Sequence, residues 1–243
     1  MRRTRAIPIA SLCFAITLAI TLGVVHAAGK KTDLSDHAWT SSEIASLPIA
    51  SIALLPPITY DGNVENRRQV EQAVGQALKG SGHRWVSPIL VRDYLLKNGG
   101  DSITTAINAK VLKDARLDSL DAPRLSRILH ARALLTVRVD EMERRELESN
   151  QSGRPSTSIQ LRGALVDSTG RLLWTLTSNE TMEGPQQDPG GNIIGMKTSG
   201  LNNSVVGDVQ PAPLFAEVLA KMCLRWTEAF PRRAAPDSSA SGK

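Results

Sequence analysis

Apolar and polar positions follow two periods along this chain, one typical of strands and the other of helices. Residues 49–57 form a short apolar run that ends in two prolines. This favours a buried central strand, because proline is tolerated where the hydrogen-bonded ladder stops. Apolar residues at helical spacing follow to about Lys79, with Asn63 as the N-cap and Gly80 at the C-terminal end. The domain is therefore expected to open with a strand and an amphipathic helix.

The same reasoning predicts further strands and helices along the rest of the chain, up to about residue 230. They are a strand over 83–86, a helix from Pro88 to Gly99-Gly100, helical spacing over 101–117, a short helix from Asp121, a strand over 134–139 and a final helix over 213–230. The charged stretch 144–155 contains Gly153 and Pro155 and is expected to be a loop.

The clearest local structure is a hairpin between residues 159 and 177. Each strand has one apolar face: Ile159, Leu161, Gly163 and Leu165 on the first, and Leu172, Trp174 and Leu176 on the second. Asp167-Ser-Thr-Gly170 supplies the turn. The element order β-α-β-α-α-α-β-β-β-α predicts an α/β (α+β) fold, with a mixed sheet of about five strands and helices mainly on one face. A single domain over 48–230 accommodates it.

The N-terminal segment has the pattern of an export signal. Met1-Arg-Arg-Thr-Arg5 is positively charged, Ile7–Val25 is uncharged and apolar, and Val25-His-Ala27 offers a cleavage site before Ala28. We therefore expect residues 1–27 to be a cleaved signal peptide and the protein to be periplasmic. An uncleaved membrane anchor is the alternative, because the apolar stretch is long enough to span a bilayer. Cys13 lacks the sequence context of a lipidation site.

Polar, non-periodic segments flank the expected domain. Residues 28–47 are predicted to be a flexible leader, and residues 231–243 a disordered tail rich in Ala, Ser and Pro. The full chain carries 29 Lys+Arg and 24 Asp+Glu, and the signal segment holds three of the arginines. The mature chain is thus nearly neutral and has no basic tract, so we expect no nucleic-acid partner.

No residue pattern indicates catalysis, a metal or a cofactor. His37, His83 and His130 lie outside any metal-ligand spacing, and Cys223 lies among apolar residues in the last helix, where a buried inert thiol is typical. The common serine-hydrolase motifs are absent from the mature sequence. The expectation is a protein that is not an enzyme and binds no cofactor.

A Gly- and Asn-rich segment, residues 184–211, is the candidate functional surface. It retains six apolar residues that a merely solvated linker would not need: Ile193, Ile194, Met196, Leu201, Val205 and Val206. Such side chains suit a loop that becomes ordered on a partner. Alternatively, they cover the domain's own sheet.

Three short stretches resemble a group of bacterial envelope proteins. They are Ile52-Ala-Leu-Leu-Pro-Pro57, Leu125-Ser-Arg-Ile-Leu-His-Ala-Arg-Ala-Leu-Leu-Thr-Val137 and Ala164-Leu-Val-Asp-Ser-Thr-Gly-Arg-Leu-Leu-Trp174. They are similar to the opening strand, the helix-to-strand step and the hairpin of the curli-secretion (CsgG-like) channel family, the TolB N-terminal domain and the lipoproteins that activate penicillin-binding proteins. His130 and Arg132 stand where that step usually has Gly and Asp.

The resemblance implies a TolB N-terminal-domain-like fold and a function in partner binding. Our leading hypothesis is a periplasmic, non-enzymatic accessory or assembly protein of an envelope system for secretion, transport or cell-wall synthesis. Its partners are expected to be envelope proteins, through which it can associate with the outer membrane. The alternatives are a pore-forming secretion subunit, for which residues 192–209 are the only candidate hairpin, and a hydrolase with a long loop over a cleft.

Overall fold

The computed structural model describes residues 36–47, 49–148, 151–187 and 210–233. Within these ranges the chain forms a seven-stranded sheet in the order β1-β7-β6-β5-β2-β4, and β3 also pairs with β5. The strands are β1 (His37–Thr40), β2 (Ser51–Leu54), β3 (Ile58–Thr59), β4 (Arg84–Val86), β5 (Ala133–Arg145), β6 (Ser156–Asp167) and β7 (Leu172–Glu183). The α-helices are α1 (Val64–Leu78), α2 (Pro88–Lys97), α3 (Gly100–Asp114), α4 (Asp121–Leu129) and α5 (Phe215–Ala229), and short 3-10 helices span Ile44–Ser46 and Lys79–Ser81. The predicted mixed α/β class is confirmed.

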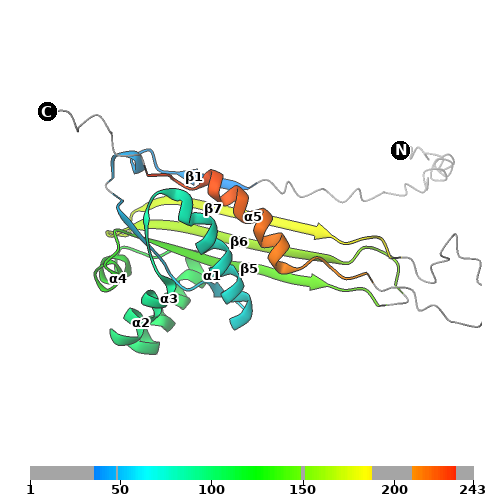
Figure 1. Cartoon of the computed structure of the whole chain (residues 1–243). Coiled ribbons are helices and arrows are strands. Elements are labelled where there is room, and N and C mark those ends of the chain that lie inside the picture. Colours follow the sequence, from blue (N-terminus) through cyan, green and yellow to red (C-terminus); the bar gives the residue numbers. More distant parts are fainter. Residues whose placement is uncertain (1–35, 48, 149–150, 188–209, 234–243) are drawn as a thin grey trace, which may run out of the picture. The chain divides into compact units, whose positions relative to one another are not determined.

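The sheet has a parallel part and an antiparallel part. β4, β2 and β5 run parallel, whereas β5, β6, β7 and β1 form an antiparallel series. Figure 1 shows β5, β6 and β7 as long neighbouring strands, with α1 and α5 lying across them. The parallel strands begin at one edge of the sheet and end at the opposite edge. We call these the amino edge and the carboxyl edge.

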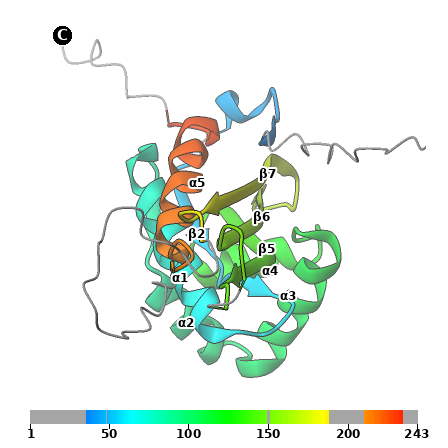
Figure 2. The ribbon, with the colours of Figure 1, turned by 90° about the vertical axis from the view of Figure 1, so that its right-hand side faces the viewer.

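Helices cover both faces of the sheet, which corrects the expectation that they lie mainly on one face. α1 and α5 pack on one face, and α2, α3 and α4 pack on the other (Figure 2). β2 explains the arrangement, because its side chains alternate between two apolar cores: Ile52 and Leu54 in the first, Ala53 and Leu55 in the second. An uninterrupted apolar run of this kind requires cover on both sides.

The predicted start of the first helix and its end near Lys79 are confirmed, but the glycine that follows the helix differs. The side chain of Asn63 accepts hydrogen bonds from the backbone amides of Glu65 and Asn66, at 2.9 and 3.1 Å. Gly80 was expected to end the helix, but a 3-10 turn follows α1 and the left-handed residue is Gly82, with φ +81°. A 3-10 turn that tightens the helix end moves the glycine two residues further along.

Part of the expected leader belongs to the sheet, which corrects the prediction for residues 36–47. β1 pairs antiparallel with β7, and the Ser41 amide donates to the Leu173 carbonyl at 2.8 Å. Asp36, just before β1, is bound by Arg225 of α5 at 2.8 Å. All four residues of β1 are exposed, so the strand carries no apolar alternation by which the sequence could have revealed it.

The hairpin and its turn are confirmed, with one change of face. Oδ1 of Asp167 accepts from the Thr169 and Arg171 amides, at 2.8 and 3.0 Å. A β-bulge interrupts the pairing beside Leu165, so Leu172 packs in the second core, whereas Trp174 lies in the first. The expected common face of Leu172 and Trp174 is therefore wrong.

The strand predicted over 134–139 is longer than its apolar part. β5 continues to Arg145 in register with β6, so residues 144 and 145 of the expected loop belong to the strand. Most residues of this extension are exposed, and polar side chains are tolerated at such positions.

Candidate functional site

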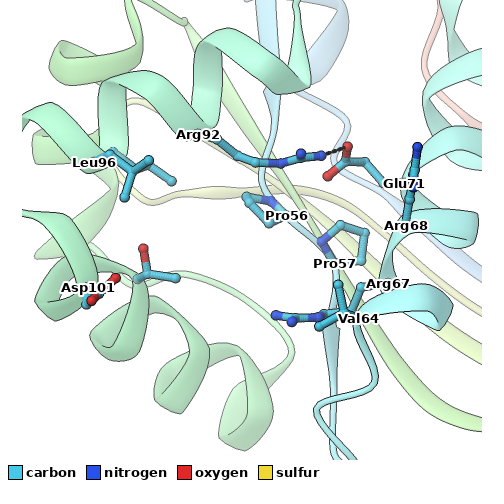
Figure 3. A pocket seen from close by; sticks show the side chains of 11 residues that line it. Pro56, Pro57, Val64, Arg67, Arg68, Glu71, Arg92, Leu96 and Asp101 are labelled. Atoms are coloured by element: carbon cyan, nitrogen blue, oxygen red, sulfur yellow. Dashed lines mark hydrogen bonds and ion pairs between the residues drawn. The ribbon is translucent and has the colours of Figure 1, made fainter.

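An amphiphilic pocket of about 350 Å³ lies at the carboxyl edge, and we call it the carboxyl-edge pocket. Its lining combines prolines after β2, the first turns of α1, the middle of α2 and the start of α3 (Figure 3). The residues are Pro56, Pro57, Val64, Arg67, Arg68, Glu71, Arg92, Leu95, Leu96, Asp101 and Thr104.

The course of the chain creates this pocket. Pro56 and Pro57 end the strand, because they have no amide hydrogens for the ladder. The chain then reaches Asn63, which caps α1 on one face of the sheet, while α2 and α3 lie on the other face. The space outside the strand end is therefore bounded by helices from both faces. Ligands in α/β sheets commonly bind at such places, outside the carboxyl ends of parallel strands.

An ion pair spans one side of the pocket. Glu71 of α1 is bound by Arg92 of α2, and Figure 3 shows the pair passing close to Pro56. The Glu71 side chain is only 10% exposed, whereas the Arg92 side chain is 50% exposed. Arg92 therefore supplies the counter-charge that a nearly buried carboxylate requires, and it joins helices that cover opposite faces.

Two further arginines, Arg67 and Arg68, line the pocket together with the carboxylates of Glu71 and Asp101. Among the described residues, the side chains of Arg67 and Arg68 have no hydrogen-bond or ion-pair partner. Figure 3 shows the Arg67 side chain extending from α1 into the space towards α3. Nearby, the hydrogen bond from the Asn63 amide is the main cause that lowers the pKa of Asp61, and the charge of Arg67 contributes.

Exposed apolar side chains stand beside these arginines. Val64 and Leu96 are 68% and 60% exposed, although both line the pocket. The lining has no histidine, cysteine, serine or tyrosine, and its polar groups besides the arginines are Glu71, Asp101 and Thr104. The arrangement suits the binding of an apolar group next to an anionic one.

None of the residues considered for chemistry lines this pocket. Cys223 is buried in α5, and burial raises the pKa of its thiol to about 11. His83 is held between the carbonyls of Ile49 and Pro231, at 2.9 and 3.1 Å. His37 lies on β1, and His130 ends α4. The described ranges hold no group of three or more His, Cys, Asp or Glu residues able to bind a metal ion.

The candidate partner-binding loop cannot be compared with the structure. Its six apolar residues, Ile193, Ile194, Met196, Leu201, Val205 and Val206, lie outside the described residues, as do the signal segment and residues 192–209. The described end of this segment is anchored, because Gln187 forms a β-bridge with Gly153. In the described part of the chain, no helix has the length and apolar character needed to cross a membrane.

Sequence reasoning did not identify the carboxyl-edge pocket. A usable signal was present: Val64 and Arg67-Arg68 directly follow the helix cap, and a helix start after a strand end points to this edge of a sheet. The contribution of α2 and α3 could not be anticipated, because it depends on which face each helix covers.

Comparisons with known proteins give only general likenesses. No protein-family model and no curated protein matches the sequence. Among solved structures, lipoprotein GNA1162 from Neisseria meningitidis is 21% identical over 55% of this chain and 83% of its own, with a TM-score of 0.43. A PelC dodecamer from Paraburkholderia phytofirmans is 13% identical over 82% of this chain and 100% of its own, with a TM-score of 0.44. The LpoB C-terminal domain from Salmonella enterica is 13% identical over 55% of this chain and 84% of its own, with a TM-score of 0.34. At these values the likenesses assign the chain to no family and no function.

Proposed function

We propose that this chain is an exported accessory protein of a bacterial cell envelope, without catalytic activity of its own. It acts by binding another envelope protein through the carboxyl-edge pocket. The partner segment carries an apolar side chain next to a carboxylate.

One observation carries the proposal: exposed apolar side chains, and arginines that have no hydrogen-bond or ion-pair partner among the described residues, share the lining of the same pocket. Val64 and Leu96 remain largely exposed to water, although large apolar side chains are stabilised by burial. The Arg67 side chain extends into the space towards α3, where Asp101 also lines the pocket. A partner that covers the apolar side chains and brings an acidic group satisfies both requirements.

The cellular location rests on the sequence. The charged start, apolar stretch and cleavage site over residues 1–27 are typical of a secretory signal. A chain with a single cysteine after that segment forms no internal disulfide, so its stability in the periplasm comes from the two apolar cores. An envelope partner is therefore the kind of protein this chain would meet.

Site-specific photo-crosslinking in cells that carry the protein tests the proposal. A photoreactive residue replaces Val64 or Leu96 in turn, and Leu120 serves as the matched control, because it is 79% exposed and does not line the pocket. We expect both pocket positions to crosslink the same envelope protein and the control position not to do so. Crosslinks that are absent from the pocket, or equally strong at all three positions, would reject the proposal.

The charge part of the proposal has its own test. Arg67→Ala/Arg68→Ala should weaken the crosslink from position 96, because the acidic group of the partner loses its counter-charge. Arg116→Ala/Arg124→Ala removes the same charge from exposed positions outside the pocket and should have no effect. Equal crosslinking in the two double variants would show that the arginines do not contribute.

A further inference from the structure

A second pocket, of about 530 Å³, lies at the opposite end of the parallel strands, and we call it the amino-edge pocket. It is lined by the first residues of β2 and β4 and by the end of α4 with the chain that leads into β5. Ser51 comes from β2, Arg84 from β4 and Ser126 from α4. The pocket shares no residue with the carboxyl-edge pocket.

The lining is strongly basic. Arg84, Arg127, His130 and Arg132 contribute to it, and the lining contains no Asp or Glu. Within the part of the chain that the structure describes, the side chains of Arg84 and Arg132 have no hydrogen-bond or ion-pair partner. Arg127 donates only to the Pro123 carbonyl of its own helix, at 3.3 Å. The positive charges are therefore not neutralised by the protein around them.

A buried hydroxyl without a partner lines the same pocket. Ser126 is only 6% exposed, and its Oγ has no hydrogen-bond partner. Buried polar atoms are nearly always paired, so an unpaired one calls for an explanation. A ligand oxygen in the pocket would accept the hydrogen bond that the described protein groups do not accept.

The backbone at His130 adds a third observation. His130 has φ +50° and ψ 39°, in the left-handed region that costs a side-chain-bearing residue conformational energy. Glycine suits such a helix end best, but this chain has a histidine here, and it belongs to the pocket lining. Its ring lies edge-to-face against Tyr94, with the centroids 5.9 Å apart.

The helix end alone does not explain this cluster. Positive side chains are favoured near the C-terminus of a helix by its dipole, and this accounts for Arg127 and His130. However, two carbonyls of the last turn of α4 already have backbone partners, because the Ser126 and Arg127 carbonyls accept from the Ala131 and His130 amides. Arg84 lies on β4 and Arg132 precedes β5, so the convergence of arginines from other elements needs a different cause.

We infer that the amino-edge pocket binds a phosphate group, either free or in the headgroup of an anionic lipid. Arginine guanidinium groups form paired hydrogen bonds with phosphate oxygens, and a nearby hydroxyl supplies an additional short donor. Arg84 reaches the ligand from β4 and Arg132 from the residue before β5, and Ser126 donates from the helix.

Binding measurements on the purified chain test the inference. Inorganic phosphate is titrated and followed by calorimetry, and co-sedimentation is measured with phosphatidylglycerol/phosphatidylcholine vesicles and with phosphatidylcholine vesicles alone. We expect binding to at least one phosphate probe, weakened roughly tenfold or more by Arg84→Ala/Arg132→Ala. Arg116→Ala/Arg124→Ala, which removes two exposed arginines outside the pocket, serves as the control and should bind like the unaltered chain.

The two probes distinguish the source of the phosphate. Binding of inorganic phosphate without retention on vesicles identifies a free phosphate ligand. Retention that requires both phosphatidylglycerol and the two arginines identifies a lipid headgroup. If neither probe binds, or the pocket variant and the control variant lose affinity equally, the inference is wrong.

Ser126→Ala provides a readout that a purely structural role would not give. Removing an unpaired buried hydroxyl should leave the melting temperature unchanged or higher, because the unsatisfied group disappears. The same change should weaken phosphate binding measurably. Unchanged phosphate affinity in a folded Ser126→Ala protein would remove Ser126 from the site, and unchanged affinity in the arginine pair as well would overturn the inference.

Discussion

The indole rings of Trp174 and Trp226 meet edge to face, with their centroids 5.8 Å apart and the planes at 72°. Both side chains are fully buried in the first core. Each ring nitrogen donates at 2.9 Å, from Trp174 to the Ala229 carbonyl and from Trp226 to the Ser178 hydroxyl. The pair thus fixes α5 to β7 through ring packing and hydrogen bonds together.

Gly163 of β6 allows the two rings to approach the sheet, so Gly163→Ala should destabilise the fold. An added Cβ would lie 2.8 Å from Cη2 of Trp226 and 3.0 Å from Cζ3 of Trp174. Both rings are rigid and buried, so we expect a loss of about 1–3 kcal/mol in the free energy of unfolding. Chemical denaturation of the purified protein measures it.

Gly75→Ala on α1 is the matched control, and its effect should have the opposite sign. Its Cβ would have Leu54 Cδ2 as nearest neighbour, at an ordinary contact distance of 3.8 Å. Alanine in place of glycine inside a helix stabilises by ~0.5–1 kcal/mol. A Gly163→Ala protein as stable as the unaltered chain would show that the rings can move apart at little cost.

Local patterns predicted the parts of the fold that depend on local physics. The Asn63 cap, the Asp167–Gly170 turn and the apolar stripe of α5 each result from neighbouring residues, and the structure contains all three. In contrast, β1 has no buried residue and so no periodicity. The bulge beside Leu165 shifts the face of Leu172 without changing the sequence pattern.

Local patterns did not predict the full lining of either pocket, because residues from separate elements converge only through the topology. Arg84 and Arg132 meet because β4 and β5 lie on either side of β2 and run parallel to it. The sequence shows that His130 and Arg132 replace the usual Gly and Asp, but it does not show that they line a pocket with Arg84. That depends on the neighbouring strand β4, which carries Arg84. Pairing order, which is non-local, decides which side chains share an edge.

Arg92→Ala should destabilise the protein by removing the counter-charge of Glu71. The carboxylate is nearly buried, so leaving it unpaired costs about 1–3 kcal/mol, at the lower end because Arg92 itself is half exposed. Denaturation at neutral pH measures the loss.

The double variant Glu71→Gln/Arg92→Ala should recover part of the lost stability, since the buried charge is gone. The exposed Arg68→Ala should stay within about 0.5 kcal/mol of the unaltered chain. Equal stability of Arg92→Ala and Arg68→Ala would contradict the role given to the pair.

Cys223 should be chemically inert in the folded protein. A thiol with a pKa of about 11 has roughly one thiolate in a thousand molecules at pH 8, and the side chain is 94% covered. Alkylation followed by mass spectrometry should therefore be slow in the native protein and fast in denaturant. Cys223→Ala should retain the crosslinks expected from the carboxyl-edge pocket. Fast modification of the native protein would show that α5 exposes this thiol.

Glu180 should contribute to the loss of stability in acid. Burial by itself would raise the pKa of this carboxyl, but hydrogen bonds from Lys221 and Arg225, at 2.7 and 2.6 Å, outweigh burial and hold the pKa below 4.5. A carboxyl whose pKa is lower in the folded state than in the unfolded state makes its full contribution to stability at pH values above its pKa in the unfolded state. That contribution is lost as the pH falls through the folded pKa. The affected window therefore begins near pH 4.5 and extends below it.

Glu180→Gln separates this contribution from general acid denaturation. At pH 7 the variant should be less stable by about 1–2 kcal/mol, a modest figure because Lys221 is 57% exposed. Below pH 4.5 its stability should decline less steeply than that of the unaltered chain, so the two curves converge. Glu183→Gln is the control on the same strand, since its side chain is 60% exposed and lies 3.7 Å from Arg154; its curve should run parallel to that of the unaltered chain. If the curve for Glu180→Gln also runs parallel to that of the unaltered chain, the ion pairs that link β7 to α5 add no pH-dependent stability. The loss of stability in acid would then come from other carboxylates, such as Asp167, whose pKa is also lowered.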